Sequence, residues 1–320
     1  MIEVKNLCKR YGEHMAIEDL SFTIENGRIY GFLGPNGAGK STTMNIMTGC
    51  LAATSGQATI DGHDIFEEAE QAKKLLGYLP EQPPLYLDMT PREYLSFVGR
   101  MKGLKGTALT EQVSEVMELT QIVDVKSRLI KHLSKGYRQR VGVAQALLGH
   151  PEVIILDEPT VGLDPKQIME IRDLIRELGK THTVLLSSHI LSEVRAVCDV
   201  IIIISKGRLV AIDTPENLER VFAAETALEI VARCTIAEAR ETVAGLEKVR
   251  QADCTPAGEG RTHVRLVTAD DADISEDVFT AFSERKFPIV SMTTVAANLE
   301  DVFIELTAEE KGGKSHDSNI

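Results

Sequence analysis

The segment Gly34-Pro35-Asn36-Gly37-Ala38-Gly39-Lys40-Ser41 decides how the rest of the sequence is interpreted. It follows an apolar, strand-like stretch, Arg28 to Leu33, and a helical pattern continues from it to about Leu51. Its glycines let backbone N–H groups approach phosphate oxygens closely, and the start of the following helix adds the positive end of its dipole. The segment therefore predicts a phosphate-binding loop, with Lys40 against the β- and γ-phosphates and the Ser41 hydroxyl on Mg²⁺. The residues of this region predicted to bind the nucleotide are Gly34, Asn36, Gly37, Ala38, Gly39, Lys40, Ser41 and Thr42.

A second motif, Ile154-Ile155-Leu156-Asp157-Glu158, supplies two carboxylates. The β-branched run that begins at Val153 has the length and composition of a buried parallel strand. Ligands of α/β sheets bind at the carboxyl ends of such strands. We therefore expect Asp157 to hold Mg²⁺, directly or through water, and Glu158 to orient or activate the attacking water.

The first 218 residues have the pattern of an α/β domain. Short strands of an antiparallel flank are expected at Ile2 to Val4 and Leu20 to Ile24. Buried strands are expected at Thr183 to Ser187 and Val200 to Ile204. Helical periodicity dominates between about Leu85 and Leu148, and another helix with one apolar face follows Asp157. Strands that alternate with crossover helices predict a largely parallel sheet.

Residues 225–308 are expected to form a separate, small α+β domain. The pattern there is strand, helix, strand, strand, helix, strand, which suggests a ferredoxin-like module closed by a last helix at Leu299 to Leu306. The tail, residues 309–320, has nothing to bury and is expected to be disordered.

Composition narrows the class of protein. Hydrophobic residues make up 43% of the chain and charged residues 26%, which is enough apolar material for a core. The formal net charge of −13 argues against nucleic acid as a partner, because binding to its phosphates needs a basic face. The longest apolar runs, such as Val200 to Ile204, are far shorter than the roughly 20 residues that cross a bilayer. If the protein moves something across a membrane, another chain supplies the pore.

The first two motifs fit any phosphate-loop ATPase. A third motif, Leu133-Ser134-Lys135-Gly136-Tyr137, narrows the choice. It resembles the signature segment of the ABC-type ATPases, whose consensus is Leu-Ser-Gly-Gly-Gln, and it lies a little upstream of Asp157 as in that family. Lys135 and Tyr137 depart from the consensus, whereas Ser134 and Gly136 are kept. The resemblance implies that Ser134 and the Gly136 N–H bind the γ-phosphate of an ATP molecule held by a facing subunit.

Further residues resemble the family's motifs in the family's order. Tyr11 is similar to the aromatic residue that stacks on adenine, and Gln82 to the glutamine that senses Mg²⁺ and the membrane partner. Asp164, in Gly162-Leu163-Asp164-Pro165, is similar to the residue that communicates across the dimer, and His189 to the histidine that contacts the γ-phosphate. The resemblance therefore implies Glu158, His189 and Gln82 as catalytic residues and Ser41, Gln82 and Asp157 as metal ligands. Taken singly, each has a plainer interpretation as a packing, turn, surface or structural residue.

The resemblance implies an ABC-type nucleotide-binding domain that contains a helical subdomain at about residues 85–148. It implies a head-to-tail dimer that closes around ATP and Mg²⁺, the second subunit being a copy or a paralogue. An integral membrane permease on a separate chain would be driven from the cytoplasmic face of the membrane. Export is expected because Asn298 to Thr307 resembles the end of the C-terminal extension in the drug-, sodium- and gliding-type exporter branch. The alternatives are a soluble ABC-type ATPase that acts on ribosomes or DNA and, with less support, a phosphate-loop phosphotransferase.

Overall fold

The structure is a computed structural model that describes residues 1–222, 227–246, 248–268 and 273–295. The chain divides into two compact units, Met1–Pro215 and Glu216–Ile320, and each contains its own hydrophobic core. The predicted helix at Leu299 to Leu306, the exporter-like segment at Asn298 to Thr307 and the tail at 309–320 lie outside the described residues.

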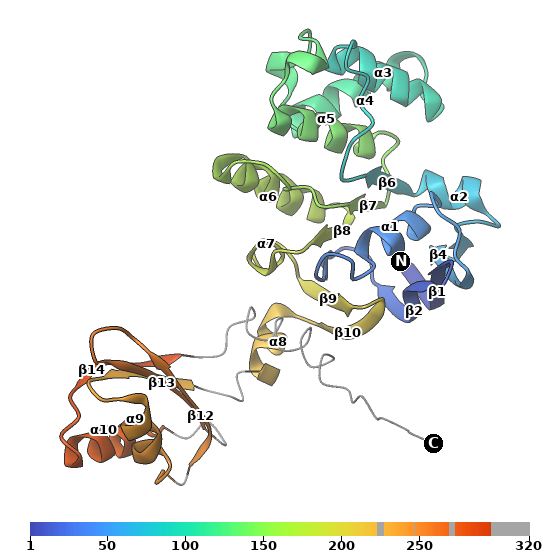
Figure 1. Ribbon diagram of the computed structural model, residues 1–320. Coiled ribbons are helices and arrows are strands. Elements are labelled where there is room, and N and C mark those ends of the chain that lie inside the picture. Colours follow the sequence, from blue (N-terminus) through green and yellow to red (C-terminus); the bar gives the residue numbers. More distant parts are fainter. Residues whose placement is uncertain (223–226, 247, 269–272, 296–320) are drawn as a thin grey trace, which may run out of the picture. The chain divides into compact units, whose positions relative to one another are not determined.

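The predicted parallel strands form a six-stranded sheet in the first unit (Figure 1). Its order is β10 (Arg208–Asp213), β9 (Val200–Ser205), β3 (Ile29–Leu33), β8 (Thr183–Ser188), β7 (Val153–Leu156) and β6 (Leu76–Leu79). All neighbouring strands are parallel except β10, which pairs with β9 in the antiparallel sense. The four central strands lie within one residue of the expected positions at each end, whereas β6 and β10 were not expected.

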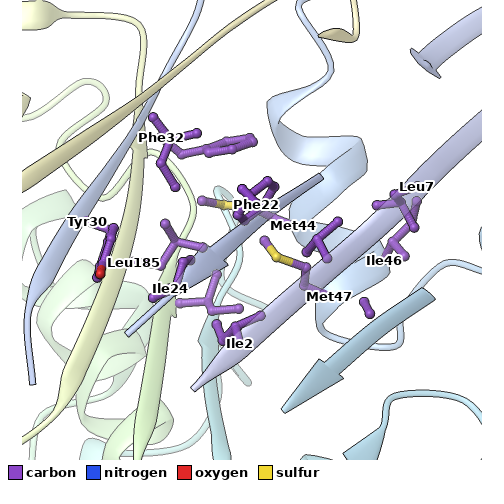
Figure 2. Close-up of a cluster of buried hydrophobic side chains, with 14 of the residues drawn as sticks. Ile2, Leu7, Phe22, Ile24, Tyr30, Phe32, Met44, Ile46, Met47 and Leu185 are labelled. Atoms are coloured by element: carbon purple, nitrogen blue, oxygen red, sulfur yellow. The ribbon is translucent and has the colours of Figure 1, made fainter. Parts of the chain in front are cut away.

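A four-stranded antiparallel sheet lies against the same core. Its order is β2 (His14–Ile24), β1 (Ile2–Tyr11), β4 (Ser55–Ile60) and β5 (His63–Asp64). Between the two sheets lies the helix α1 (Lys40–Met47), whose Met44, Ile46 and Met47 are fully buried (Figure 2). Phe22 of β2 and Phe32 of β3 meet in the same cluster, with ring centroids 5.7 Å apart. The core therefore holds α1, and with it the predicted phosphate loop, in a fixed position.

The helical region predicted from the periodicity is confirmed. It consists of α3 (Pro91–Met101), α4 (Gly106–Leu119) and α5 (Lys135–Leu147), which pack on one another, with the short turns η1 (Val123–Val125) and η2 (Ile130–His132). Thr90 and Glu93 form a reciprocal capping box at the start of α3, and Pro91 occupies its first turn. The remaining helices of this unit are α2 (Ala69–Lys74), α6 (Pro165–Gly179) and α7 (Leu191–Arg195), and α8 (Pro215–Phe222) begins at the division between the units.

The second unit has the predicted order of strands and helices. It contains β11 (Ala227–Ala232), α9 (Ile236–Val243), β12 (Val249–Pro256), β13 (Thr262–Thr268), α10 (Ser275–Glu284) and β14 (Ile289–Val295). The sheet is antiparallel with the order β12-β13-β11-β14, and the buried side chains of α9 and α10 join those of the strands in one cluster. The ferredoxin-like assignment stays a prediction.

Candidate functional site

The predicted phosphate loop joins the end of β3 to the start of α1. Gly39, the residue before α1, has φ +104°, and a Cβ atom there would lie 2.8 Å from the carbonyl oxygen of Ala16. A side chain is excluded at this position both by the backbone conformation and by the neighbouring strand β2. The first N–H groups of α1 have no partner within the helix, so the loop and the helix together present backbone donors to an anion.

A cavity of ≈ 450 Å³ lies at this loop. Among the predicted site residues, those that line it are Tyr11, Asn36, Gly37, Gly39, Lys40, Ser41, Thr42, Glu158 and His189. Gly34 and Ala38 belong to the same loop but lie behind its lining: the Ala38 N–H donates to the Pro35 carbonyl, and the Gly34 carbonyl accepts from Lys40. Residues from distant parts of the sequence thus converge on one cavity that is large enough for part of a nucleotide.

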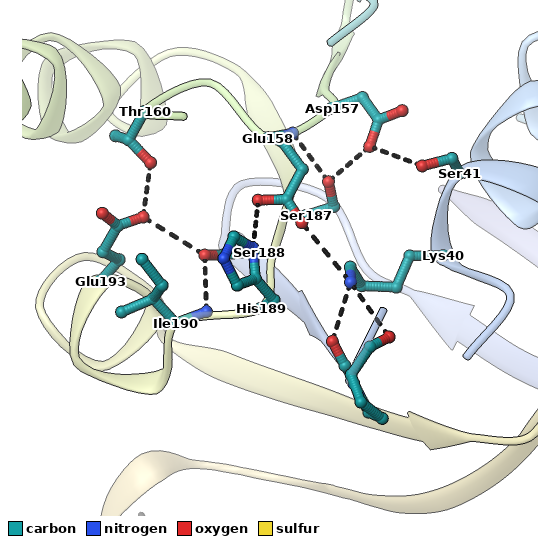
Figure 3. Close-up of polar contacts among 12 residues, drawn as sticks. Lys40, Ser41, Asp157, Glu158, Thr160, Ser187, Ser188, His189, Ile190 and Glu193 are labelled. Carbon is teal, nitrogen blue, oxygen red and sulfur yellow. Dashed lines mark hydrogen bonds and ion pairs between the residues drawn. The ribbon is translucent and has the colours of Figure 1, made fainter. Parts of the chain in front are cut away.

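Lys40 is a buried cation, with 6% of its surface exposed. Its Nζ donates to the Gly34 carbonyl at 2.8 Å and lies 3.4 Å from Oε1 of Glu158 (Figure 3). Because an unpaired buried charge is costly, the loop carbonyls and the Glu158 carboxylate are what allow the ammonium group to lie here. The phosphate loop and the end of β7 are therefore joined through a charge pair.

Glu158 adopts a backbone conformation that is unusual for a residue with a side chain, with φ +47°. Its N–H donates to Oγ of Ser187 at 2.8 Å, and its Oε2 lies 3.0 Å from Nδ1 of His189 (Figure 3). Such strain persists only where the surroundings hold the residue, and it concentrates at functional sites. Backbone and side chain of Glu158 are held by separate contacts.

Asp157 is buried between two hydroxyl groups. Its Oδ1 accepts a hydrogen bond from Oγ of Ser187 at 2.6 Å and another from Oγ of Ser41 at 3.4 Å. Burial raises the pKa of the Asp157 carboxyl, the two hydroxyl donors oppose the rise, and the charges of Glu158 and Glu81 add to it. Oxygen atoms of this kind are the ligands that Mg²⁺ prefers, so Ser41 and Asp157 fit a magnesium site beside the cavity.

Ser187 was not identified from the sequence. It lies in β8, next to β7 in the sheet, and is fully buried. The available signal was a serine within an otherwise apolar strand, which needs a hydrogen-bond partner once it is buried. That partner became identifiable only when the two strands were paired.

The structure separates Gln82 from the cavity. Its neighbour Glu81 lines the cavity and raises the pKa of Asp157, whereas Gln82 is exposed and is not among the lining residues. The residue type had pointed to Gln82, but neighbouring residues of an irregular segment face different directions, and the sequence alone does not say which side chain faces inward.

The signature residues lie elsewhere in the same unit. Ser134, Gly136, Tyr137 and Asp164 line another cavity, of ≈ 410 Å³, which shares no lining residue with the cavity at the phosphate loop. Ser134 caps α5 by accepting from the Tyr137 N–H at 3.4 Å, and Asp164 caps α6 by accepting from the Gln167 N–H at 3.0 Å. Within one chain, the two groups of predicted nucleotide-binding residues are therefore not brought together.

Comparisons with known proteins agree with this geometry. The family model described as ABC transporter matches residues 17–161. The chain is 31% identical to the linearmycin resistance ATP-binding protein LnrL of Bacillus subtilis (strain 168), over 96% of this chain and 98% of LnrL. It is 39% identical to the bacitracin transport ATP-binding protein BcrA of Bacillus licheniformis, over 65% of this chain and 68% of BcrA.

A solved structure of a dimeric ATP-binding cassette in a post-hydrolysis state, bound to ADP and Pi, has a similar fold. The TM-score is 0.61 and the identity 25%, over 67% of this chain and 98% of that one. In the part of the chain that the structure describes, no helix has the length and apolar character needed to cross a membrane. The comparisons favour a transporter subunit over the ribosome- or DNA-acting alternative. The chain belongs to the ABC transporter family and is an ATP-binding subunit that hydrolyses ATP.

Proposed function

We propose that this ATPase drives export through a membrane protein on a separate chain, by closing and opening a head-to-tail dimer. The observation that carries the proposal is the separation of the two cavities. Since Ser134, Gly136 and Asp164 line one cavity and the phosphate loop lines another, a second subunit is needed to bring a signature segment to the phosphates. The second subunit is a copy of this chain or a paralogue.

The residues that line the cavity at the phosphate loop have separate roles in this proposal. Tyr11, exposed at the edge of the cavity, stacks on adenine, while the N–H groups of the loop and Lys40 bind the phosphates. Glu158 orients the attacking water, and His189 positions the γ-phosphate and Glu158. A Mg²⁺ ion bound with ATP would neutralise the charge that develops on the phosphates during hydrolysis.

Ser41 and Asp157 would hold the Mg²⁺ ion. Among the described residues, no group of three or more His, Cys, Asp or Glu side chains is arranged to hold a metal by itself. Two protein oxygens completed by phosphate oxygens and water are the usual environment of Mg²⁺ in nucleotide sites. Gln82 does not line the cavity, and its expected metal-binding and catalytic roles stay predictions.

The membrane partner is proposed to contact an aromatic surface that follows Gln82 in the sequence. This surface consists of Tyr86, Leu87 and Phe97, which are 51%, 46% and 36% exposed. The ring of Tyr86 packs against that of Phe97, with centroids 5.4 Å apart, so these two exposed side chains form one patch, and Leu87 follows Tyr86 in the sequence. Exposed apolar patches of this kind mark interaction sites, and this one lies on a segment that continues from Glu81 in the cavity.

Export and the cytoplasmic face of the membrane are proposed from the relatives. BcrA is named for bacitracin transport and LnrL for linearmycin resistance, and the match to LnrL extends through both units of this chain. Cargo selection would belong to the membrane protein, since nothing in an ATP site distinguishes one cargo from another. The role of the second unit in this assembly is open to test by its removal.

The test is affinity purification of the Glu158→Gln protein with Mg-ATP from detergent-solubilised native cells. We expect a polytopic membrane protein at comparable stoichiometry, because the substitution should trap the closed dimer. Adding Tyr86→Ser should release the membrane protein while ATP-driven dimerisation persists. A matched control is Phe66→Ser, which changes an aromatic residue of similar exposure, 43%, outside the patch. Recovery of ribosomes or DNA-associated proteins without a membrane protein would contradict the proposal.

A further inference from the structure

Glu193 is a buried carboxylate to which the proposed function assigns no role. It lies in α7 and is 6% exposed. One of its oxygens, Oε2, accepts hydrogen bonds from the hydroxyls of Thr160 and Ser188, the latter at 3.2 Å (Figure 3). A carboxylate is costly to bury unless donors satisfy it, and here one donor comes from the loop after Glu158 and the other from the end of β8, next to His189.

The first of these loops starts at Glu158. The Val161 N–H donates to the Glu158 carbonyl at 3.2 Å, and the Leu163 N–H donates to the Thr160 carbonyl at 3.2 Å. Thr160 therefore lies at the junction of two successive turns that lead from Glu158 to Asp164, the cap of α6. Holding the Thr160 hydroxyl holds this run of turns, and Val161 within it lines the cavity.

The second loop carries His189. The Ser188 hydroxyl donates to Glu193 and also accepts from the Ile190 N–H at 3.0 Å, so it closes a short turn around His189. Nδ1 of His189 in turn lies 3.0 Å from Oε2 of Glu158. The two loops are thus joined twice, once in the cavity through His189 and Glu158 and once in the interior through Glu193.

The two connections differ in exposure. The His189 side chain is 38% exposed, so water competes for its contact with Glu158, whereas Thr160, Ser188 and Glu193 are all buried. A hydrogen bond in the interior is stronger and less readily exchanged for one to water. The strained backbone of Glu158 needs such additional restraint to keep a single conformation.

We propose that Glu193 is a positioning residue for ATP hydrolysis, which sets the distance between the Glu158 loop and the His189 loop by accepting both hydroxyls on one oxygen. The proposal rests on the roles assigned above to Glu158 and His189. Small displacements of catalytic groups lower the rate of the chemical step much more than they lower the affinity for substrate.

The kinetic test compares Glu193→Ala with Glu193→Gln in the full-length chain. We expect Glu193→Ala to lower kcat about tenfold or more, with the affinity for ATP within about twofold of the wild type. Glu193→Gln should restore most of the rate, because its amide oxygen can accept both hydroxyls. Thr160→Val should also lower kcat but should add little to Glu193→Ala, since both remove the same connection.

The control is Thr242→Val, which removes a buried threonine hydroxyl in the second unit and should leave the rate unchanged. A normal kcat in Glu193→Ala, in a preparation where Glu158→Gln is inactive, would overturn the proposal. Normal hydrolysis by Glu158→Gln would instead show that the proposed role of Glu158 is wrong.

Hydrogen exchange tests the connection without relying on hydrolysis. In Glu193→Ala, but not in Glu193→Gln, we expect faster exchange of the amides in residues 158–163 and in residues 188–190. These two segments are separated in the sequence and are joined through Glu193. Faster exchange confined to α7 would contradict the inference. If Glu193→Ala does not fold, Thr160→Val takes its place, and unchanged exchange in residues 188–190 of that variant would overturn the inference as well.

Discussion

The phosphate loop and the signature region both place a helix N-terminus beside a cavity, but they are built differently. At α1 the cap is a glycine with a left-handed backbone, the helix is buried between two sheets, and Lys40 is paired in the interior. At α5 and α6 the caps are the side chains of Ser134 and Asp164, with ordinary extended backbone. One region is held in place by the core of the unit and by a buried charge pair, and the other by exposed side-chain caps.

This contrast predicts that changes at the phosphate loop act within one subunit, whereas changes at the signature act on assembly. The buried charges of the first region also lower the folding stability of the nucleotide-free protein, and a bound nucleotide and metal would offset this loss. The exposed second region should lower folding stability less.

The largest effect is expected for Glu158→Gln. Removing the charge that orients the attacking water should lower ATP hydrolysis by about 10²- to 10⁴-fold, while the amide still fits the same space. Nucleotide binding and ATP-driven dimerisation should persist. Phosphate release measures the rate, and Glu177→Gln, on the exposed side of α6, serves as the control. A normal rate would remove Glu158 from the mechanism.

Next in size is the effect of Ser134→Arg on assembly. An arginine at the cap of α5 should block the approach of a facing subunit and abolish ATP-driven dimerisation, while each chain still binds ATP at its own phosphate loop. Light scattering with Mg-ATP follows the dimer, in the Glu158→Gln background. Ser114→Arg, at an exposed position of α4, should dimerise normally. Dimerisation of the Ser134 variant would contradict the two-subunit site.

A smaller effect of opposite sign is expected for Asp157→Asn. Burial raises the pKa of Asp157 above its ordinary 3.8, so the ionised carboxylate opposes folding once the pH exceeds the folded-state pKa. Without nucleotide at pH 8, the asparagine variant should be about 1 kcal/mol more stable than the wild type, although it should lose Mg²⁺-dependent hydrolysis.

The gain in stability should depend on pH. Because the protonated form is favoured in the folded state, the wild type recovers stability as the pH falls through the raised pKa toward 3.8, and the gap between the two proteins should close. Denaturant unfolding at several pH values measures it. A gap that widens toward low pH would mean that Asp157 is stabilised as a carboxylate.

The smallest effect is expected for Tyr137→Phe in the signature region. The Tyr137 hydroxyl donates to Asp124 at 2.7 Å in an exposed pair, and this bond raises the pKa of Tyr137. Its loss should cost less than about 1 kcal/mol of folding stability, because water replaces the partner. Thermal unfolding tests this. A loss as large as that from a buried bond would show that the signature region is as tightly held as the phosphate loop.

Some parts of the site could be predicted because their chemistry is local. The phosphate loop depends on glycines and a lysine within eight consecutive residues, and β7 was located at Val153–Leu156 because a β-branched run is a local signal. β4 and β6 were not predicted, because β4 is largely polar and β6 is only four residues long, and each is held by its neighbours in a sheet.

The sequence by itself determined that this protein has a nucleotide-binding loop, a following carboxylate pair and a family signature, since each is a run of residues whose chemistry depends on spacing along the chain. Only the tertiary structure decided that Glu81 rather than Gln82 lines the cavity and that Ser187 and Glu193 form hydrogen bonds with the segments around Glu158 and His189. Only it decided that the signature lies apart from the phosphate loop within one chain. The physical reason is that hydrogen bonds and buried charges depend on which strands and loops become neighbours, and that pairing is set by the packing of the whole unit.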